Sequence, residues 1–293
     1  MAARNSSPAV AWFAALALAA TSFPAMVSAQ ECSPADISLT SQADVDSFQA
    51  DHGPCDRVPG ELKIGGTDIS GLAGLAALAE VRYLRISDNP SLMSLDGLES
   101  LHTVVGNLII EDNGALQNID GLSSLATVTI DGGFNIEIQR NAALADLDGL
   151  AGLSEIPGSL IIHLNDSLSD IGGLSNLEEV GVILHIAANP ALSSLDGLAS
   201  LAGVGSLGIV NNASLADISG LAGLQEVRSW FEISWNPALT SLAGLSSLTR
   251  VGVASPSMGA LIIQHNAALE SLAGLSALEA VQNLALEYNP ALA

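Results

Sequence analysis

The chain has 293 residues, of which 49% are hydrophobic, 3% are aromatic and 13% are charged. Its 31 acidic and 8 basic residues give a formal net charge of −23 at pH 7, with Lys63 as the single lysine. This balance argues against nucleic acid and against an anionic membrane as partners, because a strongly acidic surface repels both.

Residues 1–29 are typical of a secretory signal peptide. Arg4 supplies the positive end, Ala9 to Ala20 the apolar run, and Val27-Ser28-Ala29 a small-residue cleavage site. A membrane anchor is the alternative, but the apolar run is short and Pro24 follows it. We therefore expect an extracellular or cell-surface protein, or a periplasmic one, with no transmembrane segment in the mature chain. Removing Arg4 changes the charge to 7 − 31 = −24.

Residues 30–57 are expected to form an N-terminal cap. Cys32 and Cys55 are the only cysteines, and both follow the signal peptide. In an exported chain such a pair predicts a disulfide, here one that staples the cap. A metal or catalytic role for these thiols would need partner residues that are absent nearby in the sequence.

A short helix is predicted between the two cysteines, over residues 41–48. Ser41 is a favourable N-cap, and Ala43, Val45 and Phe48 are expected to pack onto the first coil that follows. A repeat protein needs such a lid, because the apolar face of its first repeat is otherwise open to water.

From residue 58 to residue 293 one pattern recurs, L-x-I-x-x-N-x-x-L-x-x-L-x-G-L-x-x-L-x-x-V. Its asparagines are Asn89, Asn113, Asn141, Asn165, Asn189, Asn212, Asn236, Asn266 and Asn289, spaced by 24, 28, 24, 24, 23, 24, 30 and 23 residues. A period in the twenties predicts one elongated β-solenoid of about ten rungs of 23–30 residues, with the last rung incomplete. No cap is visible after the last rung, so we expect either that this end associates with another chain or that the sequence is a shortened form of a longer protein.

Each rung is expected to open with a short strand, as in Leu84-Arg85-Ile86, whose two apolar residues share one face. The later apolar residues recur every third position, which favours corners and tight helical turns. A glycine precedes the third leucine of each rung, and we expect it because glycine tolerates the dihedral angles of a corner. The asparagines are expected to turn inward as a ladder that satisfies backbone groups of the bend.

Two rungs are longer than the others. Residues 129–135 add four residues to one interval, and residues 254–259 add six to another. Extra residues in a solenoid form loops on one side, which is often the binding side.

The rungs Gly158-Ser159-Leu160-Ile161-Ile162-His163-Leu164-Asn165 and Gly205-Ser206-Leu207-Gly208-Ile209-Val210-Asn211-Asn212 resemble the receptor L-domain branch of leucine-rich-repeat solenoids. The start around Ser41-Gln42-Ala43-Asp44-Val45 is similar to that of bacterial secreted members. The resemblance, over about residues 31–293, implies a right-handed coil with a parallel sheet and short helical turns. Animal receptor domains of this type bind polypeptides, and fungal relatives lie in the cell wall. The shorter paired receptor domains differ from this long run, so no ligand site carries over.

The outward side of the predicted sheet is the expected binding surface. Its central column reads Lys63, Arg85, Ile109, Glu137, Ile161, His185, Gly208, Glu232, Ile262 and Ala285. Mixed charged, aromatic and apolar side chains suit recognition. The candidate ligand-facing residues are Tyr83, Arg85, Ile109, Glu137, Ile161, His163, His185, Trp230, Glu232, Trp235 and Ile262. For Trp230 and Trp235, an intramolecular role covering the loop 254–259 is the alternative to stacking on a sugar or filling a partner pocket.

No catalytic residue, cofactor or metal site is expected. The sequence has no Gly-x-Ser-x-Gly, His-Glu-x-x-His or phosphate-loop motif. His163 and His185 with Glu137, or Asp88 with Glu111 and Asp112, are the clusters nearest to zinc-type or calcium-type sets. Chance proximity in the ladder explains the histidine set more simply than a zinc site does. Solvated surface charges explain the acidic set more simply than a calcium site does.

We therefore expect a non-enzymatic recognition scaffold, secreted or at the cell surface, that binds a protein or a glycan through its outward face. The alternative is a structural wall or envelope protein without a specific ligand. The acidic surface leaves two interpretations, a solubilising face or adaptation to a salt-rich habitat in which repulsion is screened.

Overall fold

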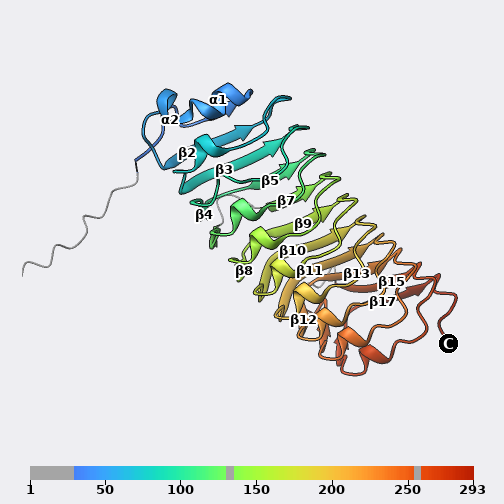
Figure 1. Cartoon of the computed structure of the whole chain (residues 1–293). Helices are drawn as coiled ribbons and strands as arrows, with labels where there is room; N and C mark the ends of the chain where they lie inside the picture. Colours follow the sequence, from blue (N-terminus) through green and yellow to red (C-terminus); the bar gives the residue numbers. More distant parts are fainter. Residues whose placement is uncertain (1–29, 130–134, 254–258) are drawn as a thin grey trace, which may run out of the picture.

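The computed structural model describes residues 30–129, 135–253 and 259–293. The chain winds as one elongated leucine-rich solenoid in which each coil lies on the previous one (Figure 1). The predicted signal peptide and most of the two predicted insertions fall outside the described residues. None of the helices in the described ranges combines the length and the apolar character needed to cross a bilayer.

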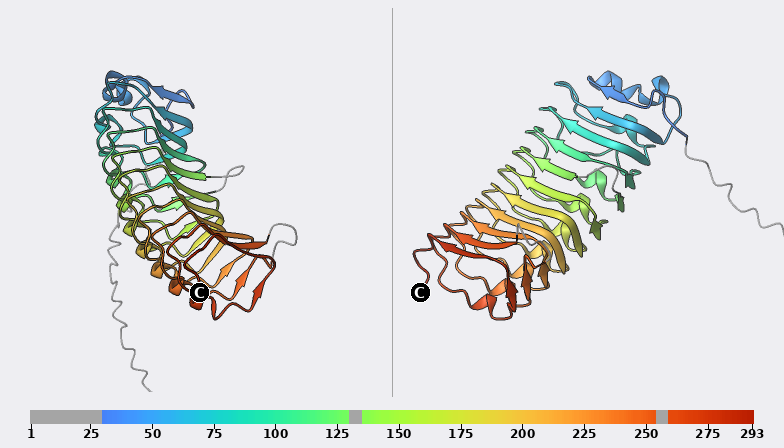
Figure 2. Two further views of the ribbon diagram at one scale, coloured as in Figure 1. Left: turned by 90° about the vertical axis from the view of Figure 1, so that its right-hand side faces the viewer. Right: turned by 180° about the vertical axis from the view of Figure 1, so that it is seen from behind.

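The main strands form one parallel ladder along one side of the solenoid (Figures 1 and 2). They are β1 (Ile37–Leu39), β2 (Arg57–Ile64), β3 (Glu80–Ser87), β5 (Leu108–Glu111), β7 (Asn135–Gln139), β9 (Ser159–His163), β10 (Glu179–Ala187), β11 (Gly203–Val210), β13 (Trp230–Ser234), β15 (Ala260–Gln264) and β17 (Leu284–Glu287). The pairing of β1 with β2 extends the ladder one strand before the first rung that the sequence predicts.

Each coil also carries a two-residue strand just before its main strand. These short strands are β4 (Thr103–Val104), β6 (Thr127–Val128), β8 (Glu155–Ile156), β12 (Glu226–Val227), β14 (Arg250–Val251) and β16 (Ala280–Val281). In β2, β3, β10 and β11 the two parts form one continuous strand, with a register shift between them, as between Val180 and Ile183. This shift turns the chain from one side of the coil to the next.

The predicted tight turns are 3-10 helices that form a second row, on the side away from the main strands (Figure 2). They are η1 (Ala73–Leu75), η2 (Asp120–Leu122), η3 (Asp148–Leu150), η4 (Gly172–Leu174), η5 (Asp196–Leu198), η6 (Ser219–Leu221), η7 (Ala243–Leu245) and η8 (Ala273–Leu275). The leucines between the two rows fill a continuous core in which most side chains are fully buried.

The N-terminal segment closes the first coil. Cys32 and Cys55 form a disulfide, as the sequence predicts. Helix α1 (Gln42–Asp46) begins after Ser41, whose side chain caps it in a reciprocal pair with Asp44. Helix α2 (Phe48–Asp51) follows directly.

Both helices pack against η1, and they bury Val45 and Phe48 completely. The expectation for Ala43 was wrong, because this side chain is exposed. The short α1 ends before a full second turn, so its buried stripe is reduced to Val45. The lid on the first coil therefore depends on one valine and one phenylalanine.

The nine repeat asparagines lie in one column inside the turn that follows each main strand, and eight of them are fully buried. Asn165 is representative. Its Nδ2 donates to the carbonyl of Ile138 at 2.9 Å, and its Oδ1 accepts from the backbone N–H of Asn141 at 3.1 Å. Its own N–H donates to Oδ1 of Asn189 at 3.1 Å, so the pattern passes to the next coil.

The residue before each of these asparagines has a positive φ, between 53° and 60°. These residues are Asp88, Asp112, Arg140, Leu164, Ala188, Asn211, Trp235, His265 and Tyr288. A left-handed residue reverses the chain sharply at the end of the strand, which is how the following asparagine reaches the interior. Among non-glycine residues, only Asn, Asp and His adopt this conformation with some frequency.

The explanation predicted for the repeat glycines was wrong at most positions. Among them only Gly97 has a positive φ, of 110°. The others are required by space, because a Cβ on Gly149 would lie 1.9 Å from the carbonyl oxygen of Ile119 in the preceding coil. Gly71 is the exception, since no atom lies within 4 Å of the position of its missing Cβ.

Replacing Asn165 by Ala is expected to lower the free energy of unfolding by about 2–6 kcal/mol. The change leaves the N–H of Asn141 and the carbonyl of Ile138 buried without these partners, and each such group costs about 1–3 kcal/mol. Denaturant titration measures the loss. Asn176→Ala is the matched control, because its amide also donates to the preceding coil, to the carbonyl of Ala151 at 2.9 Å, but at an exposed site. A similar loss in both variants would contradict the special role of the buried column.

Gly149→Ala is expected to cost about 3 kcal/mol or more, because the coil cannot accept a methyl group against backbone without shifting. Gly71→Ala should change stability by only about 0.5 kcal/mol in either direction, since its methyl group meets nothing. Thermal melting of the two variants tests the pair. Equal melting temperatures would show that close packing between coils does not explain the glycines.

Candidate functional site

The outward face of the main ladder carries the side chains predicted for the central column, in register. Lys63, Arg85, Ile109, Glu137, Ile161, His185, Gly208, Glu232, Ile262 and Ala285 pair in succession from β2 to β17. Tyr83 and Trp230 lie in the preceding column, and His163 in the following one. Inward residues repeat from coil to coil, whereas these outward ones differ in size, charge and polarity.

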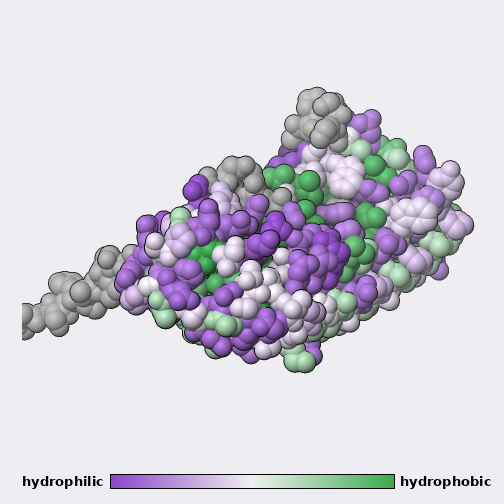
Figure 3. All heavy atoms as spheres, turned by 90° about the horizontal axis from the view of Figure 1, so that it is seen from above, coloured by the Kyte–Doolittle hydropathy of each residue, from purple (hydrophilic) through white to green (hydrophobic). Residues whose placement is uncertain are grey.

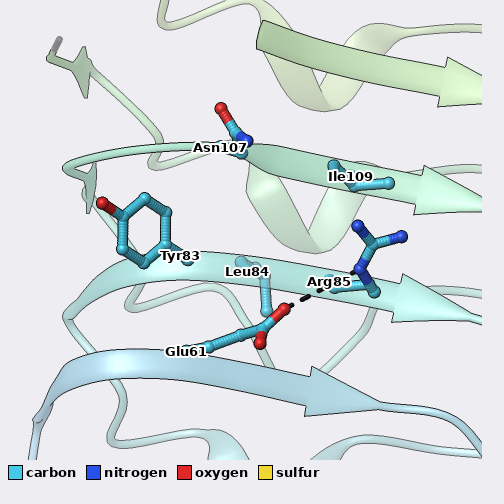
Figure 4. Close-up of a pocket in the computed structure, with 6 residues that line it drawn as sticks. All are labelled: Glu61, Tyr83, Leu84, Arg85, Asn107 and Ile109. Carbon is cyan, nitrogen blue, oxygen red and sulfur yellow. Dashed lines mark ion pairs between the residues drawn. The ribbon is translucent and has the colours of Figure 1, made fainter. Parts of the chain in front are cut away.

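A pocket of about 200 Å³ lies on the outward face over β2, β3 and β5. Glu61, Tyr83, Arg85, Asn107 and Ile109 line it, and Figure 4 shows their side chains projecting from three neighbouring coils. Ile109 is only 7% exposed, so it provides an apolar floor beneath the polar groups. The pocket thus offers an aromatic ring, an amide and a guanidinium around one apolar side chain.

The glycine at position 106 makes room for the ring of Tyr83. A Cβ on Gly106 would lie 2.2 Å from Cε1 of Tyr83, so the ring occupies the space that a side chain would fill. The guanidinium of Arg82 lies 5.3 Å from the centre of the same ring. The ring is therefore held by its surroundings rather than projecting freely. Asn107, which we did not select from the sequence, enters the pocket because it lies in the same column as Tyr83.

Ion pairs extend from this pocket along the next coils. The Arg85 guanidinium contacts the carboxylates of Glu61 and Glu111, the first at 3.8 Å. Arg140 binds Glu111 at 2.8 Å and Asp112 at 2.7 Å. Hydrogen bonding from Arg140 lowers the pKa of Asp112, and Asp112 in turn raises the pKa of Arg140. Two of the three carboxylates considered for calcium, those of Glu111 and Asp112, are thus paired with arginines of the same chain.

His163 and His185 come together on the outward face, with ring centres 6.3 Å apart. Glu137 lies in the column of His185, but Ile161 separates the two. Within the described ranges, no three His, Cys, Asp or Glu side chains are grouped so that they could hold a metal ion. Burial lowers the pKa of both histidines, and Arg140 lowers that of His163 further.

Gly208 leaves space for the rings of His185 and Trp230. A Cβ at Gly208 would lie 2.5 Å from Cδ2 of His185 and 3.2 Å from Cη2 of Trp230, so both rings reach over this glycine. The neighbouring Glu232 accepts a hydrogen bond from the hydroxyl of Ser234. Ile262 follows Glu232 in the column. The centre of the outward face is therefore an aromatic patch next to a carboxylate.

Trp235 leaves the sheet face, because it is the left-handed residue that follows β13. Its indole stacks on the imidazole of His265, with ring centres 3.8 Å apart and planes inclined by 11°. His265 stacks in turn on Tyr288 at 4.5 Å and 9°. His265 and Tyr288 were missed from the sequence, although both directly precede a repeat asparagine, as Trp235 does. On the face seen in Figure 3, small apolar areas interrupt a mostly hydrophilic surface.

No family model matches this chain, and none of the curated proteins matches it in sequence. Among solved structures, it is similar to the crystal structure of an internalin from Listeria monocytogenes, with 21% identity and a TM-score of 0.42. The match covers 83% of this chain and 62% of the internalin chain, so this chain spans less than two thirds of that protein. The fold is therefore established by its own strand pairing, and the internalin adds nothing to the interpretation of the site.

Acidification is expected to destabilise the protein through His163 and His185. Their pKa values are lowered in the folded state, so the unfolded chain takes up protons first as the pH falls below the ordinary histidine value of about 6.5. The stability that they contribute is complete at pH 8 and is lost progressively towards the lowered pKa of the folded state. Melting from pH 8 to pH 5 should show a smaller decrease for the H163Q/H185Q variant than for the unchanged chain. Parallel curves would contradict this origin of the pH dependence.

Proposed function

We propose that this chain is a recognition scaffold, secreted or at the cell surface, that binds a protein or a glycan through the outward face of its parallel sheet. The observation that carries the proposal is the contrast between the two faces of the same strands. Inward positions repeat leucine, isoleucine and asparagine in each coil. Outward positions vary, and they gather a pocket and an aromatic patch above Gly106 and Gly208.

Binding rather than catalysis fits the chemistry of this face. The carboxylate of Asp112 is hydrogen-bonded by Arg140, which lowers its pKa and makes it a poor group for exchanging protons near neutral pH. Tyr83, Arg85 and Asn107 combine an aromatic surface with hydrogen-bond donors, a combination common at the centres of interfaces. We propose no enzymatic activity, cofactor or resident metal.

The second candidate is a structural protein of a wall or envelope that has no specific ligand. The regular core supports it, because stacked coils give a rigid rod whatever the surface residues are. The two candidates differ in one measurable property. A recognition scaffold shows saturable binding that depends on particular outward residues, whereas a spacer shows association that no single outward residue controls.

The test is a glycan array together with a pull-down from proteome and cell-envelope extracts, using residues 30–293. Y83S and R85S should each weaken a saturable ligand at least tenfold, or by about 1.4 kcal/mol. W230A extends the test to the centre of the face. Met93→Ser is the control, because Met93 is exposed in the same coil as Tyr83 but outside the sheet. Binding that resists all three outward changes would reject the outward face as the binding surface, and persistent envelope association without saturation would favour the structural role.

A further inference from the structure

A groove of about 360 Å³ runs beside the sheet, along the edge where the main strands end. One wall is the stacked column of Trp235, His265 and Tyr288. The other is a column two residues further along each coil, formed by Ala213, Pro237, Ala267 and Pro290. Asn211 is the residue equivalent to Trp235 in the preceding coil, and it extends the first wall by one coil. The groove therefore crosses four successive coils.

Two of the three residues of the aromatic wall, Trp235 and Tyr288, do not suit its backbone conformation. All three have a left-handed conformation, at φ 59°, 55° and 53°. Trp and Tyr are poorly suited to it, whereas Asp88, Asp112 and Asn211 suit the same position in other coils. The remaining coils fill it with Arg140, Leu164 and Ala188, so the repeat imposes this conformation on other unsuited residues as well. Strained positions of this kind are retained where the surrounding structure gains something else. The gain is not burial of the rings, because Trp235 is 51% exposed and Tyr288 is 69% exposed.

The groove is uncharged in a strongly acidic protein. None of its lining residues is Asp, Glu, Lys or Arg, although the chain carries 31 acidic residues. An anionic ligand would be repelled by the rest of the surface, and a cationic ligand would find no carboxylate in the groove to pair with. The ligand that fits is neutral. It needs apolar surface to contact the rings and the prolines, and hydroxyl groups to meet the indole N–H, the tyrosine O–H and the Asn211 amide.

The spacing of the rings distinguishes between two kinds of neutral ligand, a proline-rich peptide and a sugar chain. At 3.8 and 4.5 Å between centres, the three rings leave no slot between them into which a proline could insert. One face of Trp235 is covered by His265, while the opposite face looks toward the coil of the much smaller Asn211 and Ala213. That face suits a sugar ring, which is apolar on its C–H side and carries hydroxyls at its edge. Neighbouring coils lie about 4.7–4.9 Å apart, close to the length of one hexose unit, so a linear chain can follow the groove.

We propose that this edge groove binds a neutral linear glycan. One sugar packs on the free face of Trp235. The chain then passes along the groove between the edges of the stacked rings and the prolines, with hydroxyls hydrogen-bonded to Asn211 and Tyr288. The groove is separate from the outward sheet face and does not depend on the function proposed for it. Either surface can therefore fail its test without affecting the other.

The test uses residues 30–293 with Trp230→Phe, which leaves Trp235 as the single tryptophan and a direct probe of the groove. Neutral oligosaccharides of glucose, mannose, xylose and N-acetylglucosamine are titrated, with oligogalacturonate as a charged comparison and a proline-rich peptide as a non-glycan comparison. At least one neutral oligosaccharide should change the Trp235 emission saturably, with affinity rising with chain length to about four sugars. Oligogalacturonate and the peptide should bind at least tenfold more weakly.

Two variants assign the binding to the stacked column. W235N, followed by calorimetry because the probe is lost, and Y288N should each weaken binding at least tenfold. Asparagine tolerates the left-handed conformation, so both variants are expected to stay folded, which circular dichroism checks. Leu164→Asn is the matched control, because Leu164 has the same conformation and is exposed but lies outside the groove, and it should bind as the unchanged protein does.

Several results would overturn the proposal. One is the absence of a saturable response to any neutral oligosaccharide up to millimolar concentration. Another is unchanged affinity in folded W235N or Y288N. Tighter binding of the charged oligosaccharide or of the proline-rich peptide would also reject it. If the Y83S variant loses glycan binding and the Y288N variant keeps it, the ligand binds on the sheet face and not in the groove.

Discussion

The hydrogen bonds of the asparagine column hold the coils in place. A chain that reverses at the end of each strand leaves backbone N–H and carbonyl groups pointing into an apolar interior, where unpaired groups are costly. The side chain of Asn165 satisfies two such backbone groups of the preceding coil, because it accepts a hydrogen bond from the N–H of Asn141 and donates one to the carbonyl of Ile138. Because each asparagine serves a different coil from its own, no coil can shift without exposing these groups. The column therefore sets the register of the whole ladder.

That constraint determines which positions are free to vary. The asparagine reaches the interior only because the preceding residue has a positive φ, and this backbone turn places the side chain of that residue outside. The strand residues that alternate with the core leucines also point outward. The solenoid therefore has two variable surfaces, a sheet face and a strand-end edge, over a core that barely changes from coil to coil.

The two surfaces differ in chemistry along the molecule. Near the N-terminal end the sheet face combines Arg85, Glu111 and Arg140 in a network of ion pairs next to the pocket of Tyr83 and Asn107. Near the C-terminal end the edge is uncharged and aromatic. Coils of the same backbone thus present a charged site and a neutral site about half the solenoid apart. Since each coil contacts mainly its neighbours, the two sites can change independently.

The sequence alone determined the coil, its period, the asparagine column and the membership of each outward column. A period-2 strand and a fixed repeat leave only one register that keeps leucine inside. The tertiary structure decided what depends on distances between coils, whose residues are 23 to 30 positions apart. The close carbonyl behind Gly149 and the pairing of Arg140 with Asp112 are of this kind. So is the stack of Trp235, His265 and Tyr288, because a repeat pattern shows that three residues share a column but not that their rings lie flat on one another.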